Sequence, residues 1–176
     1  MMDKIILSGF GGQGVMFIGK VLAYAAMAGN LEVCWIPSYG PEMRGGTANC
    51  SVIISDEEIN SPVIDQSDAA IVLNQPSYDK FLPRIQSGGT LVVNSSIVQP
   101  NQVRNDITVI AIPATDIANE LGKPALANMV CLGALMPKLT LITMNTLQKA
   151  MDTVVGKKKP ALYEVNIQAI QKGMEW

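Results

Sequence analysis

The first thirty residues join an apolar run, a glycine-rich turn and an amphipathic segment without interruption. Residues 4–8 have the length and composition of a buried strand, and residues 15–27 repeat apolar side chains at helical spacing. The six residues between them contain four glycines. A strand that turns directly into a helix is the first part of a βαβ unit, since the helix returns the chain to the start of a parallel strand. This feature predicts an α/β fold.

The rest of the chain continues to alternate short apolar runs with helical patterns. Further strands are predicted at residues 31–36, 47–55, 69–74, 90–94 and 107–112. Further helices are predicted at residues 77–86, 116–121, 126–136, 145–155 and 161–172. The strand at 47–55 follows a proline- and glycine-rich loop and is a candidate for an antiparallel strand. We expect residues 1–176 to form one domain, a Rossmann-like open sheet, mostly parallel, of about five to seven strands with helices on both faces.

The predicted helix at residues 126–136 is apolar on nearly every side. Eleven residues rise only about 17 Å, well short of the width of a bilayer, so we expect no membrane partner. Two interpretations stay open at this point. The segment is a central core helix of the monomer, or it is a helix that a neighbouring subunit partly covers.

Charge and composition exclude several classes of function. With 13 Lys and Arg against 15 Asp and Glu, the net charge of −2 gives no electrostatic basis for binding nucleic acid. The absence of histidine excludes histidine-based catalysis and metal binding. The three cysteines, Cys34, Cys50 and Cys131, form no CxxC pair and are too few for an iron-sulfur cluster. We expect no catalytic residue and no metal site in this chain, and we interpret the cysteines as buried thiols of a cytoplasmic protein.

Charged residues make up only 16% of the chain, where about 25% is usual. We therefore expect some apolar surface to contact a partner, either another subunit or a second copy of this chain. An unusually apolar core is the alternative explanation.

The glycine-rich turn fits the pattern GxGxxG at Gly9, Gly11 and Gly14, with Gly12 between them. Glycines at this place allow a tight turn, and the amides of the following helix favour an anion by roughly 0.3 to 1 kcal/mol. The alternative is that the glycines only let the helix and the strand pack closely. A dinucleotide site is disfavoured, because the second strand ends at Cys34 to Pro37 without the acidic residue that holds a ribose.

Several polar residues follow the ends of the other predicted strands. Because the carboxyl ends of parallel strands meet at one edge of a sheet, we expect them to lie near the glycine turn. The candidate binding residues at this edge are Gly9, Gly11, Gly12, Gly14, Ser38, Tyr39, Arg44, Asn74 and Asn94. Arg44 can bind a carboxylate or a phosphate through two hydrogen bonds. The alternatives are an ion pair with Glu42 that braces the loop, and a polar rim that is only solvated.

Five segments together resemble the gamma subunit of 2-oxoacid:ferredoxin oxidoreductases. They are residues 9–15, the loop 38–46 with Thr47-Ala48-Asn49-Cys50-Ser51, Leu73-Asn74-Gln75-Pro76, Val92-Val93-Asn94-Ser95-Ser96 and Ala127-Asn128-Met129-Val130. The resemblance covers nearly the whole chain and is best to the small 2-oxoglutarate or 2-oxoisovalerate type. The pyruvate gamma subunit and the indolepyruvate small subunit share much of the pattern, so the 2-oxoacid stays open.

The resemblance implies a multi-subunit enzyme that converts a 2-oxoacid, coenzyme A and oxidised ferredoxin into an acyl-CoA, CO2 and reduced ferredoxin. It implies thiamine diphosphate, magnesium and iron-sulfur clusters on partner subunits, and it associates the domain represented by this chain with coenzyme A. Partners are then the alpha and beta subunits, with a delta subunit and a homodimer of the isolated chain as further candidates, and ferredoxin through the complex. The isolated chain is expected to be inactive. The alternatives are a stand-alone Rossmann-type nucleotide-binding protein and a purely structural subunit without ligand.

Overall fold

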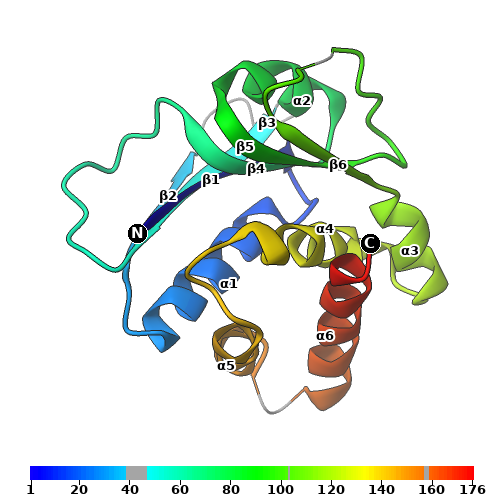
Figure 1. The fold of residues 1–176 in the computed structure, drawn as a ribbon. Coiled ribbons are helices and arrows are strands. Elements are labelled where there is room, and N and C mark those ends of the chain that lie inside the picture. The colour runs from blue at the N-terminus through cyan, green and yellow to red at the C-terminus, as the bar shows by residue number, and fades with distance from the viewer. Residues whose placement is uncertain (39–46, 103, 157–158) are drawn as a thin grey trace.

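The computed structural model describes residues 1–38, 47–102, 104–156 and 159–176. They form a six-stranded sheet in the order β2-β3-β1-β4-β5-β6 with helices on both faces (Figure 1). The strands are β1 (Met2–Phe10), β2 (Glu32–Ser38), β3 (Thr47–Ser55), β4 (Ser67–Val72), β5 (Ile85–Asn94) and β6 (Thr108–Ile112). The pairs β1–β4, β4–β5 and β5–β6 are parallel, whereas β3 is antiparallel to both β1 and β2. Of the six described strands, β3 alone is therefore reversed, as its sequence predicts, and the expectation of a mostly parallel open sheet is confirmed.

The helices divide unevenly between the two faces of the sheet. They are α1 (Val15–Ala28), α2 (Gln75–Phe81), α3 (Ala114–Glu120), α4 (Ala127–Leu135), α5 (Met144–Val154) and α6 (Pro160–Met174). One apolar cluster joins α1, α3, α4, α5 and α6 to one face of the sheet, and a second joins α2 to the other face. The larger of the two apolar cores therefore lies between the sheet and the five helices of the first cluster.

The predicted helix at residues 77–86 is wrong at both ends. The side chain of Asn74 accepts a hydrogen bond from the backbone of Ser77, so α2 begins two residues early. The helix gives way to a short 3-10 turn, Leu82–Arg84, because Pro83 has no backbone N–H for a continued α-helix. Strand β5 then starts at Ile85. Gly88 and Gly89, which stand between the predicted helix at 77–86 and the predicted strand at 90–94, lie inside β5.

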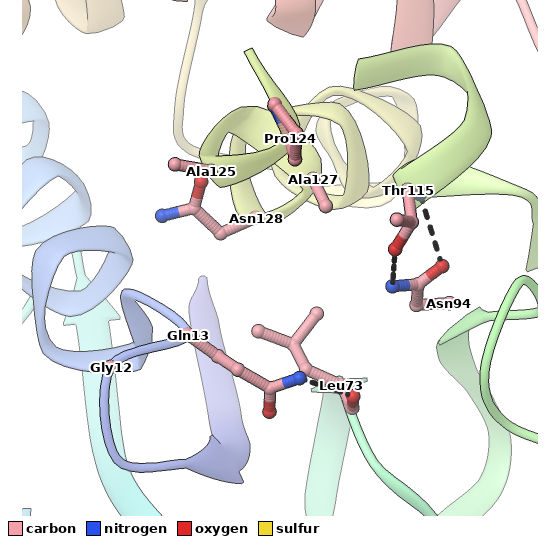
Figure 2. A pocket seen from close by; sticks show the side chains of 9 residues that line it. All are labelled: Gly12, Gln13, Leu73, Asn94, Thr115, Pro124, Ala125, Ala127 and Asn128. Carbon is pink, nitrogen blue, oxygen red and sulfur yellow. Dashed lines mark hydrogen bonds between the residues drawn. The ribbon is translucent and has the colours of Figure 1, made fainter. Parts of the chain in front are cut away.

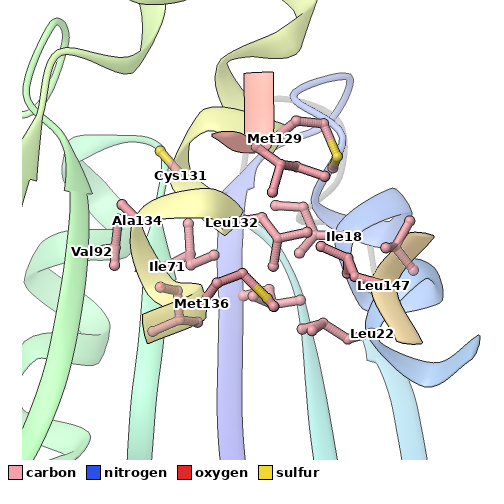
Figure 3. Packing of buried hydrophobic residues seen from close by; sticks show 14 of the residues in the cluster. Ile18, Leu22, Ile71, Val92, Met129, Cys131, Leu132, Ala134, Met136 and Leu147 are labelled. Atoms are coloured by element: carbon pink, nitrogen blue, oxygen red, sulfur yellow. The ribbon is translucent and has the colours of Figure 1, made fainter. Parts of the chain in front are cut away.

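The apolar helix α4 belongs to the core of the monomer. All its residues from Asn128 to Leu135 are buried within this single chain. Figure 3 shows Met129 and Leu132 of α4 packed among Ile18 of α1, Leu147 of α5 and Ile71 of β4. Of the two interpretations of residues 126–136, the central core helix is confirmed.

The cysteines are free, and two of the three are buried as predicted. Burial raises the pKa of the Cys50 thiol to about 11 and raises that of Cys131 as well. Cys34 is only half-buried, because it lies on β2, an edge strand with a neighbour on one side among the described strands. Within the ranges that the structure describes, no helix combines the length and the hydropathy that a membrane span needs.

Candidate functional site

The carboxyl ends of β1 and β4 lie next to each other, and the chain leaves them toward opposite faces of the sheet. After β1 it enters α1, and after β4 it enters α2 on the other side. This reversal opens a crevice, the switch point at which open α/β sheets bind ligands. A cavity of about 260 Å³ lies here. Its lining residues are Gly12, Gln13, Leu73, Asn94, Thr115, Pro124, Ala125, Ala127 and Asn128 (Figure 2).

The side chain of Gln13 connects the glycine turn to the end of β4 through two hydrogen bonds. Its Oε1 accepts a hydrogen bond from the backbone N–H of Phe10 at 2.6 Å, and its Nε2 donates to the carbonyl of Leu73 at 3.0 Å. The side chain therefore fastens the turn to the end of β4, as Figure 2 shows for the bond to Leu73. A Cβ atom on Gly9 would lie 2.7 Å from Gln13 Oε1, so Gly9 leaves room for this amide.

Gly14 and Gly12 serve different purposes in the turn. Both have left-handed backbones, with φ angles of 80° and 91°. A Cβ atom on Gly14 would lie 2.2 Å from the amide nitrogen of Asn128, whereas one on Gly12 would meet nothing within 4 Å. Gly9 and Gly14 thus fit the packing interpretation of the motif. Gly12, whose surroundings are open, lines both this cavity and a neighbouring hollow of about 220 Å³ that includes Gly11.

Besides Gly12, Asn94 is the predicted site residue that lines the cavity. It is buried at the end of β5 and donates from Nδ2 to Oγ1 of Thr115 at 2.9 Å (Figure 2). Its Oδ1 accepts the backbone N–H groups of Thr115 and Ser96, both at 3.3 Å. Asn94 therefore fixes the first turn of α3 against the cavity.

The remaining predicted residues lie elsewhere. Asn74 is buried at the start of α2, where it caps the helix, and its Nδ2 has no acceptor among the described residues. Ser38 is exposed at the end of β2 and pairs with Asn49 of β3. Neither residue is part of the cavity lining. Tyr39 and Arg44 lie outside the described residues, as does the proposed ion pair of Arg44 with Glu42.

The electrostatic character of the cavity comes from backbone rather than from charged side chains. Helix α4 begins at its wall and α1 begins two residues after Gln13, so the positive ends of both helix dipoles lie near this region. At α4 the N–H groups of Ala127 and Met129 are already bonded, to the carbonyl of Pro124 and the side chain of Asn128. Among the residues that the structure describes, the lining includes no Asp, Glu, Lys or Arg. This part of the cavity can accept an anionic group of small size, and its described side chains supply no general acid or base.

Three polar residues that line this cavity were not predicted as site residues: Gln13, Thr115 and Asn128. Gln13 stands inside the glycine motif, and Asn128 is a polar residue at the start of an otherwise apolar helix. A buried amide in such a place needs a hydrogen-bond partner, and this was the available signal. Nothing in the local sequence marks Thr115.

A comparison with protein families matches residues 4–176 to the family described as pyruvate ferredoxin/flavodoxin oxidoreductase. The chain is 39% identical to the 2-oxoglutarate synthase subunit KorC of Methanocaldococcus jannaschii, covering 99% of this chain and 94% of that one. It is 36% identical to the ketoisovalerate oxidoreductase subunit VorA of Methanothermobacter thermautotrophicus, covering 98% of this chain. There the chain spans only 36% of the length of the relative.

Two solved structures share the fold over nearly the whole chain. The gamma subunit of a keto/oxoacid ferredoxin oxidoreductase from Geobacter sulfurreducens has a TM-score of 0.83 and 31% identity, covering 98% of this chain and 96% of that one. The 2-oxoglutarate:ferredoxin oxidoreductase of Magnetococcus marinus, with 2-oxoglutarate, coenzyme A and succinyl-CoA bound, has a TM-score of 0.89 and 27% identity. The match covers 99% of this chain and 30% of the Magnetococcus chain.

Proposed function

Because the chain belongs to the pyruvate ferredoxin/flavodoxin oxidoreductase family, we propose that it is the gamma subunit of a 2-oxoacid:ferredoxin oxidoreductase. The assembled enzyme converts a 2-oxoacid, coenzyme A and oxidised ferredoxin into an acyl-CoA, CO2 and reduced ferredoxin. The full-length likeness to KorC and to the Geobacter gamma subunit supports this role. Its partners are the alpha and beta subunits, with a delta subunit as a further candidate. Its free cysteines suit a reducing compartment, so we place the enzyme in the cytoplasm.

This subunit contributes binding and assembly rather than redox chemistry. Cys50 and Cys131 are buried in the core with raised pKa values, which disfavours the thiolates that a cluster needs. Among the described residues, no three Cys, Asp or Glu side chains gather as metal ligands would. In this proposal thiamine diphosphate, magnesium and iron-sulfur clusters belong to the partner subunits, and the isolated chain is inactive.

The carboxyl-edge cavity binds part of coenzyme A in this proposal. The observation that carries it is the open backbone of Gly12, beside the first turns of α1 and α4. Such amides favour a phosphate group. A volume of about 260 Å³ is below that of common ligand sites, so it can hold only a fragment of this large cofactor. The rest of the molecule lies against a partner subunit. The bound coenzyme A of the Magnetococcus relative supports this choice of ligand.

A purely structural subunit is the second candidate, because Gly9 and Gly14 are both explained by packing against amide side chains. A stand-alone nucleotide-binding protein is less favoured, since β2 ends without an acidic residue for a ribose. Titration of the isolated chain with NAD, NADP and FAD tests this last alternative. Micromolar binding of any of them would support it.

Gly12→Val in the assembled enzyme separates coenzyme A binding from a structural role. We expect the Michaelis constant for coenzyme A to rise about tenfold with little change in kcat, because the new side chain projects where the ligand binds. Gly88→Val is the matched control, since Gly88 has a similar φ of 83° and open surroundings but lies in β5 away from the cavity. Equal Michaelis constants for the two variants would favour the purely structural subunit.

Arg44→Ala tests residues 39–46, which follow β2 in the sequence. If its guanidinium binds a phosphate or a partner carboxylate in a buried contact, its loss costs about 1 to 3 kcal/mol of binding free energy. We expect a higher Michaelis constant for coenzyme A or weaker subunit association, measured by kinetics and by sedimentation of the complex. Unaltered values of both would remove Arg44 from the site.

A further inference from the structure

We propose that Asn128 is a positioning residue that fixes the glycine turn so that Gly12 faces the cavity. Asn128 is the second residue of α4, only 6% exposed, and it lines the cavity (Figure 2). The inference rests on the proposed binding of a phosphate-bearing ligand at Gly12. It assigns to Asn128 no contact with that ligand, because its effect passes through the turn.

The two ends of the Asn128 carboxamide have different partners. Oδ1 accepts the backbone N–H of Met129 at 2.9 Å, and Nδ2 donates to the carbonyl of Gly14 at 3.3 Å. The same carbonyl accepts the N–H of Ile18 at 3.1 Å, one of the first hydrogen bonds of α1. One side chain therefore joins the first turns of two helices that are 114 residues apart in the sequence.

The fit between Asn128 and Gly14 is tight. A Cβ atom on Gly14 would lie 2.2 Å from Asn128 Nδ2 and 3.1 Å from its Cγ, so the amide occupies the space of a side chain at position 14. Gly14 also keeps a left-handed φ of 80°. Asn128 thus lies against the last residue of the turn, two positions after Gly12, and its amide is placed to hold that turn in position.

The choice of Asn rather than Asp at this position favours a role in binding. At the start of a helix a carboxylate is normally at least as stabilising as an amide, because it complements the helix dipole. Asp at 128 would keep the acceptor for Met129 but would place a carboxylate oxygen against the carbonyl of Gly14. The tether to the turn would break, and a negative charge would stand at the wall of the cavity.

Asn128→Asp in the assembled enzyme tests the proposal through the Michaelis constant for coenzyme A. We expect it to rise about tenfold, while kcat at saturating coenzyme A changes less than twofold. The matched control is Asn166→Asp. Asn166 is also buried, 4% exposed, but it donates within its own helix, α6, to the carbonyl of Leu162 at 2.7 Å. The control variant should change the Michaelis constant less than twofold.

The outcomes separate this inference from the proposed function. If Gly12→Val raises the Michaelis constant and Asn128→Asp does not, Asn128 is not a positioning residue and the site stands. If neither variant changes it, the proposed site itself fails. A rise in both, with Asn166→Asp unchanged, supports the inference when Asn128→Ala, which adds no charge at the cavity wall, raises the Michaelis constant as well.

A second measurement needs no ligand and remains informative if Asn128→Asp folds poorly. Gly14→Ala should lower the thermal unfolding midpoint, because the methyl group strikes the Asn128 amide. In the double variant Gly14→Ala with Asn128→Ala this clash is gone. Its unfolding midpoint should therefore fall by less than the sum of the decreases in the two single variants. Strictly additive shifts would show that the two residues are not coupled and would overturn the inference.

Discussion

At the amino edge of the sheet, where the parallel strands begin, carboxylates tie the strands to the segments around them, whereas at the carboxyl edge neutral amides and hydroxyls do so. Asp3 of β1 accepts hydrogen bonds from Thr140 and Leu141, and Asp68 of β4 accepts the backbone N–H of Lys4 at 2.7 Å. Asp106, just before β6, pairs with Arg104. At the carboxyl edge the corresponding side chains are those of Gln13, Asn94, Thr115 and Asn128.

This difference indicates which edge is left free for an external group. A carboxylate satisfies several donors at once, so the amino-edge donors are occupied within the chain. At the carboxyl edge a carboxylate would compete with an anionic ligand for the same backbone amides. Asp116 on α3 is an exception, and its side chain is engaged by the hydroxyl of Ser96 at 2.9 Å. The neutral lining of the cavity therefore agrees with the proposed phosphate-binding role.

Asp3→Ala should have the largest effect on stability. Asp3 is 5% exposed and accepts the N–H and hydroxyl of Thr140, at 3.1 and 2.9 Å, and the N–H of Leu141 at 3.2 Å. Removing the carboxylate leaves these donors without a partner, so we expect a loss of about 3 kcal/mol in denaturant unfolding. Asp79→Ala, on the exposed surface of α2, should change stability by less than about 0.5 kcal/mol. Similar losses in both variants would contradict the distinction between the edges.

Asn94→Asp places a carboxylate, the group that ties the strands at the amino edge, at the carboxyl edge. The new carboxylate still accepts from Ser96 and Thr115, and the Thr115 hydroxyl can turn to donate to it, so the loss of stability should be near 1 kcal/mol. The Michaelis constant for coenzyme A should rise several-fold through charge repulsion. Asn101→Asp, at an exposed position, is the control for the added charge. An unchanged Michaelis constant for Asn94→Asp would mean that the neutrality of this edge has no bearing on the ligand.

Most of the fold could be predicted from the sequence because its pattern is local. The run at residues 47–55 is reproduced residue for residue as β3, and the helix predicted at 15–27 differs from α1 by one residue. The end of α2 was missed because the helical spacing continues into β5, and only Pro83 marks the boundary. The half-buried state of Cys34 depends on the order of the strands, which local patterns do not contain.

The candidate site could be predicted only in part. The edge of the sheet follows from the glycine turn, and Gly12 and Asn94 do line the cavity. What the motif could not reveal is that Gly9 and Gly14 make room for Gln13 and Asn128, since these contacts depend on side chains placed by the tertiary fold. For the same reason Asn74, which looks similar to Asn94 in the sequence, proves to be a helix cap.

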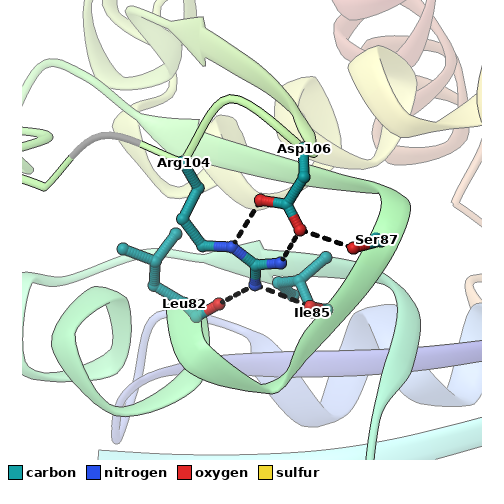
Figure 4. Close-up of polar contacts among 5 residues, drawn as sticks. All are labelled: Leu82, Ile85, Ser87, Arg104 and Asp106. Atoms are coloured by element: carbon teal, nitrogen blue, oxygen red, sulfur yellow. Dashed lines mark hydrogen bonds and ion pairs between the residues drawn. The ribbon is translucent and has the colours of Figure 1, made fainter.

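Asp106→Asn should have the smallest effect on stability. The pH dependence of this effect tests whether the charge of Asp106 stabilises the amino edge. Arg104 donates from Nε to Asp106 Oδ1 at 2.9 Å and pairs with Oδ2 through Nη2, while the Ser87 hydroxyl also donates to Oδ2 (Figure 4). The same guanidinium donates to the carbonyls of Leu82 and Ile85, so the pair fastens the segment before β6 to the start of β5.

The hydrogen bonds from Arg104 and Ser87 hold the pKa of Asp106 well below its usual range, so the folded state favours the ionised carboxylate. The stability that this adds is present above the pKa of the unfolded chain, about 4, and is lost as the pH falls toward the lower pKa of the folded chain. Asp106→Asn should therefore lower the thermal midpoint at pH 7 by less than Asp3→Ala does, because the carboxylate is half exposed. The difference from the parent chain should shrink between pH 5 and pH 2. A difference that stays constant over that range would mean that geometry rather than charge holds this part of the amino edge.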